Sequence, residues 1–139
     1  MRDIIFRGKG SNSDKWCYGF LVPYPGSICG WALVKECYLD KGRSSINAFG
    51  YTEVMNNTIG QYTGMNDKNG NRIFEGDILR MDTFNPDICE VRFIEGAFCL
   101  QFPGGLYPID IHYIHHADRP QAMVIGNIHD NPELLEVGS

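Results

Sequence analysis

The chain has 139 residues, of which 43% are hydrophobic and 12% aromatic, enough for a single domain with a packed core. Its sixteen glycines and seven prolines do not fit an all-helical protein. The formal net charge is −5 and no cluster of Lys and Arg is present. This argues against a protein that coats nucleic acid through its phosphates, although a small basic patch stays compatible with it.

No apolar run is long enough to span a bilayer, and Ile4–Phe6 is too short for the core of a signal peptide. We therefore expect a cytoplasmic protein without a membrane partner. The cysteines are odd in number and lack CxxC spacing, so we expect free, mostly buried thiols and no zinc site. They are Cys17, Cys29, Cys37, Cys89 and Cys99.

The N-terminal third predicts strands. Trp16, Tyr18 and Phe20 alternate with smaller residues and therefore share one strand face. We interpret this stripe as core against a second sheet, with an exposed stacking platform for bases or sugars as the alternative. A second strand is predicted within Ile28–Tyr38. The polar stretch Asp40–Asn47 follows as a surface loop, and it is our first candidate for partner contact because binding residues commonly lie on loops.

Four glycines punctuate the segment Ile59–Arg80, which predicts tight hairpins of a small β-barrel. Asn69-Gly70 is the preferred pair for a type I′ turn. We expect it to join a strand near Ile59–Thr63 to the run Arg72–Phe74.

Asp67, Asn69 and Asn71 also stand at positions 1, 3 and 5 of a calcium-loop pattern. That pattern needs glycine at position 6 and glutamate at position 12, where this chain has Arg72 and Ile78. We therefore favour the turn and expect no calcium site.

Glu75 and Asp77 precede a strand predicted at Ile78–Met81. Spacing of two would place both carboxylates on one strand face, as an acid–base pair requires. We favour a turn in which Asp77 caps the backbone or accepts its N–H groups.

A hairpin is predicted from Ile88–Ile94 and Ala97–Phe102 around Glu95-Gly96, and a further strand at Met123–Ile128. Asn131 is a suitable N-cap and Pro132 a suitable first helical residue. A short C-terminal helix should therefore run to about Glu136.

The only histidine cluster lies between residues 110 and 118. In a helix, His112, His115 and His116 would share one side, and with Asp118 they could bind zinc. We favour a short amphipathic turn with hydrated histidines, and expect no native metal, no cofactor and no catalytic residue. No nucleophile elbow, P-loop or HExxH motif is present, so we do not expect an enzyme.

Several short sequence motifs together resemble those of the YopX family of bacteriophage and prophage proteins. They are FRGK at Phe6–Lys9, W-x-Y-G at Trp16–Gly19, IGQYTG at Ile59–Gly64, DKNG at Asp67–Gly70, FEGDIL at Phe74–Leu79 and VIGNIHDNPELL at Val124–Leu135. The resemblance implies a small, β-rich phage protein of uncharacterised function, and it supplies no catalytic residues.

These observations predict a mainly β single domain over residues 1–139. It comprises an N-terminal β segment (1–56), a small SH3-like barrel (57–139) and the short C-terminal helix. The predicted function is a non-catalytic binding module for a host or phage protein in the bacterial cytoplasm, with nucleic acid less favoured and a homo-oligomer left open. The alternatives are a self-assembling structural or accessory protein, and a metal-dependent hydrolase using the 110–118 cluster.

Overall fold

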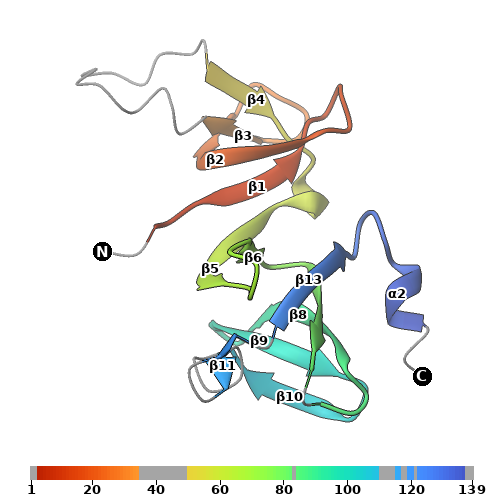
Figure 1. Ribbon diagram of the computed structural model, residues 1–139. Coiled ribbons are helices and arrows are strands. Elements are labelled where there is room, and N and C mark those ends of the chain that lie inside the picture. The colour runs from red at the N-terminus through yellow and green to blue at the C-terminus, as the bar shows by residue number, and fades with distance from the viewer. Residues whose placement is uncertain are drawn as a thin grey trace. The chain divides into compact units, whose positions relative to one another are not determined.

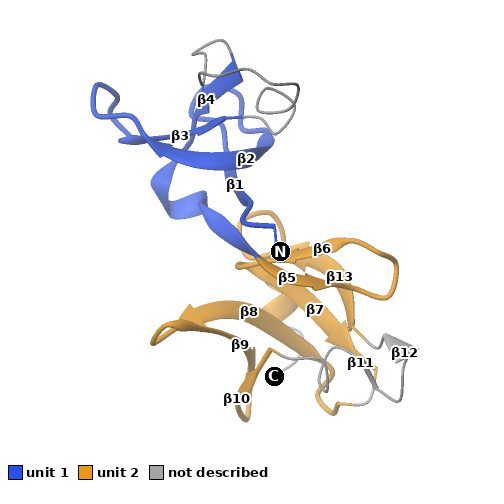
Figure 2. Cartoon of the chain, turned by 90° about the vertical axis from the view of Figure 1, so that its left-hand side faces the viewer, with its two compact units in different colours: residues 1–62 blue, residues 63–139 orange. Residues whose placement is uncertain are grey.

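The computed structural model describes residues 3–34, 50–82, 84–109, 115–116, 119–120 and 122–136. Within these residues the chain is mainly β, with two larger antiparallel sheets, a two-stranded pair, one short α-helix and one 3₁₀ turn (Figure 1). The chain divides into two compact units, residues 1–62 and 63–139, which we call the N-terminal and C-terminal units (Figure 2). The division falls close to the predicted segment boundary at residues 56 and 57. That the whole chain forms one domain stays a prediction.

In the N-terminal unit, β1 to β4 form an antiparallel meander and β5 pairs with β1, which gives the order β4-β3-β2-β1-β5. A 3₁₀ turn, η3 (Asn56–Thr58), connects β4 to β5. The boundary between the units falls inside β5, which also neighbours β6 in the C-terminal unit. The strands are β1 (Phe6–Lys9), β2 (Trp16–Pro23), β3 (Trp31–Val34), β4 (Tyr51–Glu53) and β5 (Gly60–Asn66).

The aromatic stripe on β2 is not the buried core that the alternation predicted. Tyr18 is 44% exposed, and Trp16 and Phe20 are only partly buried. The Trp16 ring lies against two cations of β1, with the Arg7 guanidinium carbon 4.7 Å and Lys9 Nζ 5.5 Å from its centroid. The ring packs against Arg7, which is only 6% exposed, and itself stays partly exposed at the surface of the sheet.

The C-terminal unit contains an open five-stranded sheet in the order β10-β9-β8-β7-β13. The described residues form no closed barrel, so the SH3-like barrel is not confirmed. The elements are β6 (Arg72–Phe74), β7 (Asp77–Met81), β8 (Ile88–Ile94), β9 (Ala97–Phe102), β10 (Gly105–Pro108), the two-stranded pair β11 (His115–His116) and β12 (Arg119–Pro120), β13 (Ala122–Asn127) and α2 (Glu133–Glu136).

Alternate residues of β7, β8 and β9 build the core of the C-terminal unit, as expected for strands with one buried face. The cluster consists of Ile73, Leu79, Met81, Cys89, Val91, Leu100, Phe102 and Ala122. Each large apolar side chain buried in this way contributes about 1.5–3 kcal/mol. Phe93 continues the alternation in sequence, but it is 50% exposed, so the buried face of β8 ends at Val91.

The hairpin predicted around Glu95-Gly96 is confirmed: β8 and β9 pair with Ile94 opposite Ala97. Glu95 has φ 51° and Gly96 has φ 84°. Positive φ at both central residues of a two-residue loop is the signature of a type I′ turn.

The turn at Asn69-Gly70 is real, but the predicted type I′ geometry is wrong. Gly70 has φ 82°, whereas Asn69 is not among the described residues with positive φ. Gly70 N donates to Asp67 O at 3.0 Å and Asp67 N donates to Asn71 O at 2.8 Å. This is a three-residue loop with glycine at its left-handed position. The Asp67 carboxylate selects it by accepting the N–H groups of Asn69 and Asn71.

Asp77 has the structural role that the sequence favoured. It is buried, and its Oδ2 accepts the backbone N–H of Phe74 at 2.8 Å. Glu75 lies in the turn between β6 and β7, where the chain passes from one sheet to the other. The one-face geometry of an acid–base pair therefore does not arise, because only Asp77 belongs to a strand.

The short helix α2 is confirmed, but Asn131 does not cap it through its side chain. Leu134 N donates to the main-chain oxygen of Asn131, while Asn131 Oδ1 accepts the N–H of Asn127. Gly126 makes room for this arrangement, since a Cβ there would lie 2.6 Å from Asn131 Oδ1. The Asn131 side chain thus fixes the turn before the helix.

The described cysteines are free thiols, as predicted, but only Cys89 is buried. Cys17 on β2, Cys29 in the β2–β3 loop and Cys99 on β9 are partly exposed. Cys37 lies outside the described residues.

Candidate binding pocket

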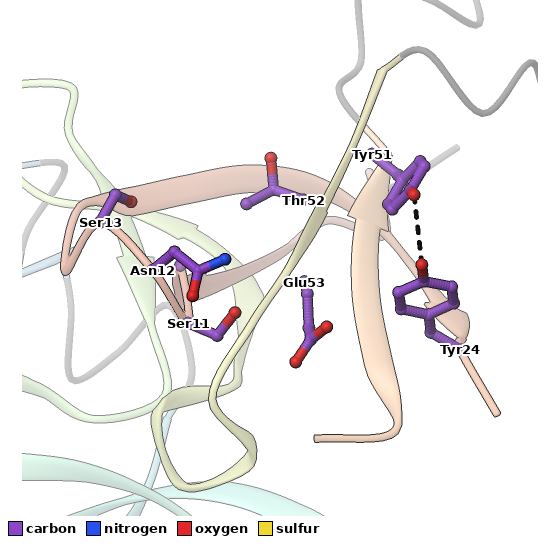
Figure 3. Close-up of a pocket in the computed structure, with 8 residues that line it drawn as sticks. Ser11, Asn12, Ser13, Tyr24, Tyr51, Thr52 and Glu53 are labelled. Atoms are coloured by element: carbon purple, nitrogen blue, oxygen red, sulfur yellow. Dashed lines mark hydrogen bonds between the residues drawn. The ribbon is translucent and has the colours of Figure 1, made fainter. Parts of the chain in front are cut away.

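A pocket of about 450 Å³ opens on the N-terminal unit. Three separate stretches of the chain supply its walls: the β1–β2 loop, the residue after β2, and β4 (Figure 3). Hydroxyl, amide and carboxylate groups predominate among the lining residues, which are Gly10, Ser11, Asn12, Ser13, Tyr24, Tyr51, Thr52 and Glu53.

The β1–β2 loop is tied both to itself and to β4. Gly10 N donates to Lys15 O at 2.9 Å, which closes the loop, and Ser11 N donates to Glu53 O at 2.9 Å. Gly10 is needed for this tight path, because a Cβ there would lie 2.6 Å from Ser13 Oγ. The polar wall of the pocket is therefore held by backbone hydrogen bonds.

Two tyrosines form the opposite wall. The hydroxyl oxygens of Tyr24 and Tyr51 are 3.2 Å apart and hydrogen-bonded, and the rings meet edge to face with centroids 5.2 Å apart. Tyr24 is anchored by its N–H, which donates to Gly30 O at 2.8 Å across the β2–β3 loop. The hydrogen bond with Tyr51 raises the pKa of Tyr24, and the nearby charge of Glu53 adds to this, so the phenol stays protonated.

Glu53 carries the only ionisable carboxyl group among the lining residues. Tyr51 and Glu53 are two residues apart on β4 and share a face of the strand. Figure 3 shows the Glu53 side chain between those of Asn12 and Tyr24. The Cys29 thiol is also hydrogen-bonded to Glu53, and this bond raises the pKa of Cys29.

The histidine cluster predicted from the sequence is untested as a site. His112 and Asp118 lie outside the described residues. His115 and His116 form the extended strand β11, so the helical spacing that would align them does not apply to these two residues. Across the described parts of the chain, no three His, Cys, Asp or Glu residues come close enough to hold a metal ion. The predicted contact loop Asp40–Asn47 also lies outside them.

The pocket could not be predicted from the sequence, because no local motif encodes it. Its residues lie up to 43 positions apart, from Gly10 to Glu53, and converge only through strand pairing. The one signal available in the sequence was the run Ser11-Asn12-Ser13, a polar turn between two predicted strands.

The chain matches the model of the YopX protein family over residues 6–136. It belongs to the YopX family. Among solved structures it is similar to the crystal structure of protein EF1440 from Enterococcus faecalis, with 28% sequence identity and a TM-score of 0.62. The similarity covers 97% of this chain and 99% of that one. No curated protein matches the chain.

The motifs that carry the YopX resemblance mostly have structural roles, because their residues fix turns and strand pairing. Arg7 of the FRGK motif lies against the ring of Trp16 in the W-x-Y-G motif. In the β1–β5 strand pairing, Arg7 is opposite Gly60 of the IGQYTG motif. In the DKNG motif, the Asp67 carboxylate accepts a backbone N–H of its own turn. In the FEGDIL motif, the Asp77 carboxylate does the same for the turn between β6 and β7. The described residues include no helix that is both long and apolar enough to cross a membrane.

Proposed function

We propose that this YopX chain is a non-catalytic, phage- or prophage-encoded binding module that holds a host or phage protein in the bacterial cytoplasm. The observation that carries the proposal is the pocket, with its polar loop wall, tyrosine pair and single carboxylate. Loops and edge strands held by a rigid sheet are the usual place for binding residues. The small SH3-like barrel predicted for residues 57–139 stays part of this proposal.

Exposed aromatic and apolar side chains on β4, on its neighbour β3 and in the β2–β3 loop favour a protein partner. Tyr51 is 41% exposed, Trp31 is 38% exposed, and Ile28 in the β2–β3 loop is fully exposed. Tyr and Trp are enriched at protein interfaces because they bury much area at little entropic cost. The loop Asp40–Asn47 precedes β4 in the chain and remains a second candidate for contact.

The test is capture of partners from lysogenic or infected cells by the full-length chain. Tyr51→Ala removes an exposed ring from the pocket and should abolish capture of the specific partner. Phe93→Ala removes a similarly exposed ring from the C-terminal unit and serves as the matched control. A partner retained equally by both variants would contradict the proposed site, and loss on deletion of Lys41–Ser45 alone would move the contact to that loop.

Self-assembly is the second candidate function, and the edge strand β10 favours it. Leu106, Tyr107 and Pro108 on this strand are exposed, and β10 pairs only with β9 among the described strands. An unpaired strand edge can add a strand from another copy, although Pro108 works against this. The mass of the protein in solution distinguishes the two functions. Stoichiometric metal lost on His112→Ala would instead support a hydrolase.

A further inference from the structure

Building on the proposed function, we propose that the pocket recognises the cationic end of a lysine or arginine side chain presented by the protein partner. The occupant follows from the combination of a carboxylate with two aromatic rings around one space. None of the eight lining residues is basic.

The geometry brings the necessary groups together. Tyr51 and Glu53 share a face of β4, and the Tyr24 ring packs edge to face against Tyr51. Edge-to-face packing leaves part of each ring face uncovered by the other ring, and the charge of Glu53 acts on Tyr24. Because the tyrosine hydroxyls bond to each other, the pair is held in place before a ligand arrives.

A cation is the ligand that these groups satisfy best. Ammonium and guanidinium groups are attracted to aromatic faces and form charge-assisted hydrogen bonds with carboxylates. The side-chain oxygens of Ser11 and Asn12 are available acceptors for the remaining N–H donors. An anion would instead be repelled by Glu53, and the overall charge of −5 adds to the attraction of a basic partner.

No described basic side chain already serves as this ligand. Four basic residues, Lys9, Lys68, Arg80 and Arg92, are paired with Asp14, Asp82, Asp87 and Glu90 respectively and not with Glu53. Arg7 and Lys9 of β1 lie over the Trp16 ring. The Glu53 carboxylate, which is hydrogen-bonded to Cys29, has lone pairs for further bonds.

The experiment is a titration of the full-length protein followed by NMR of its tyrosine rings and the Glu53 side chain. The probes are N-acetyl-lysine-N-methylamide, N-acetyl-arginine-N-methylamide and the neutral N-acetyl-norleucine-N-methylamide, with glucose as a hydroxyl-rich neutral ligand. Either or both of the basic probes should produce saturable shifts at Tyr24, Tyr51 and Glu53, with Kd about 1–10 mM. Norleucine and glucose should produce none.

Glu53→Gln keeps the shape of the side chain and removes its charge. It should weaken binding of a basic probe about fivefold, the effect of one partly exposed ion pair. Glu133→Gln makes the same charge change at an exposed position of the C-terminal unit and should leave binding unaltered. Equal weakening by both variants would reduce the effect to overall charge and overturn the proposal.

The outcomes separate this inference from the proposed function. If glucose or norleucine binds at the tyrosines and the basic probes do not, the cation assignment is overturned, while loss of partner capture by Tyr51→Ala would still support a binding pocket. If no probe binds and Tyr51→Ala captures the partner normally, both proposals fail.

Discussion

The carboxylate of Asp67 accepts backbone N–H groups from Asn69, Asn71 and Val124 at 2.9, 2.8 and 3.0 Å. It therefore fixes the turn after β5 and, at the same time, a backbone group of β13 that is 57 residues away in sequence. The register of β13 on β7 shifts between Val124 and Gly126, and Asp67 bonds to the N–H at the start of that shift. Asp67, which stands at position 1 of the calcium-loop pattern, therefore accepts backbone hydrogen bonds and fixes local structure.

Replacing Asp67 with Ala should lower the free energy of unfolding by about 2–3 kcal/mol, because charge-assisted hydrogen bonds are lost and the Val124 N–H loses its partner. Urea denaturation measures this change. Asp82→Ala is the control: its exposed ion pair with Lys68, at 3.0 Å, should be worth no more than about 1 kcal/mol. Equal losses in the two variants would refute the role assigned to Asp67.

The same hydrogen bonds give Asp67 a pH signature. Burial alone would raise the pKa of Asp67, but the N–H donors of Val124, Asn71 and Asn69 outweigh burial and lower the pKa from its ordinary 3.8. A lowered folded-state pKa stabilises the fold above pH 3.8, and this stabilisation is lost as the pH falls through the folded-state pKa.

The difference in unfolding free energy between the parent and Asp67→Asn should therefore be constant near neutral pH and shrink below pH 3.8. Subtracting the variant removes the contribution of other groups, such as Glu90, whose pKa is raised by burial and only partly lowered again by Arg92. A difference that stays unchanged into strong acid would count against the assigned pKa direction.

Cys89 should be the least reactive of the described thiols. It is fully buried, and burial raises its pKa to about 12, so almost no thiolate forms at pH 8. Cys17 and Cys99 are partly exposed and should be alkylated first by iodoacetamide. Mass spectrometry of the modified peptides measures the order, and urea should remove the protection of Cys89. Rapid native labelling of Cys89 would disagree with its place in the core.

The geometry of the turn between β5 and β6 depends on the positive φ of Gly70. Gly70 has φ 82° and an added Cβ would meet no atom within 4 Å, so a substitution there costs backbone strain alone. Gly70→Ala should lower stability by about 1–2 kcal/mol in thermal unfolding. Gly104→Ala is the control, because a Cβ at Gly104 would also meet no atom within 4 Å but Gly104 lacks the positive φ. The unfolding free energy of this variant should stay within about 0.5 kcal/mol of that of the parent. Similar costs at both sites would contradict the left-handed turn.

Local elements could be predicted from the sequence because their signals are local. The β8–β9 hairpin follows from a two-residue loop between apolar runs, and α2 from Pro132 after a polar turn. The turn type at Gly70 could not be predicted, because Asp67 selects it through contacts that also depend on β13. The pairing of β13 with β7 could not be predicted either, since the register of a non-local pair leaves no periodic signal.

At the scale of the whole molecule, each compact unit has buried residues of its own. Leu33 and Val54 are buried in the N-terminal unit, and the β7–β9 cluster is buried in the C-terminal unit. The mainly β class was predictable from glycine content and alternation, whereas the pocket required the pairing of β2, β3 and β4. Family membership identifies no functional residues, because the motifs that carry it mainly fix turns and strand pairing.

Charge is a property of the whole molecule, and it predicts weak binding to duplex DNA. The chain has 12 basic and 17 acidic residues, and two of the basic ones, Arg7 and Lys9, are engaged with Trp16. Binding that depends on displaced counterions needs several phosphate contacts by Lys or Arg. Fluorescence anisotropy with an arbitrary duplex at physiological salt should therefore give a Kd no tighter than about 10⁻⁴ M. Micromolar binding that weakens steeply with added salt would show that a local basic surface outweighs the overall acidic charge.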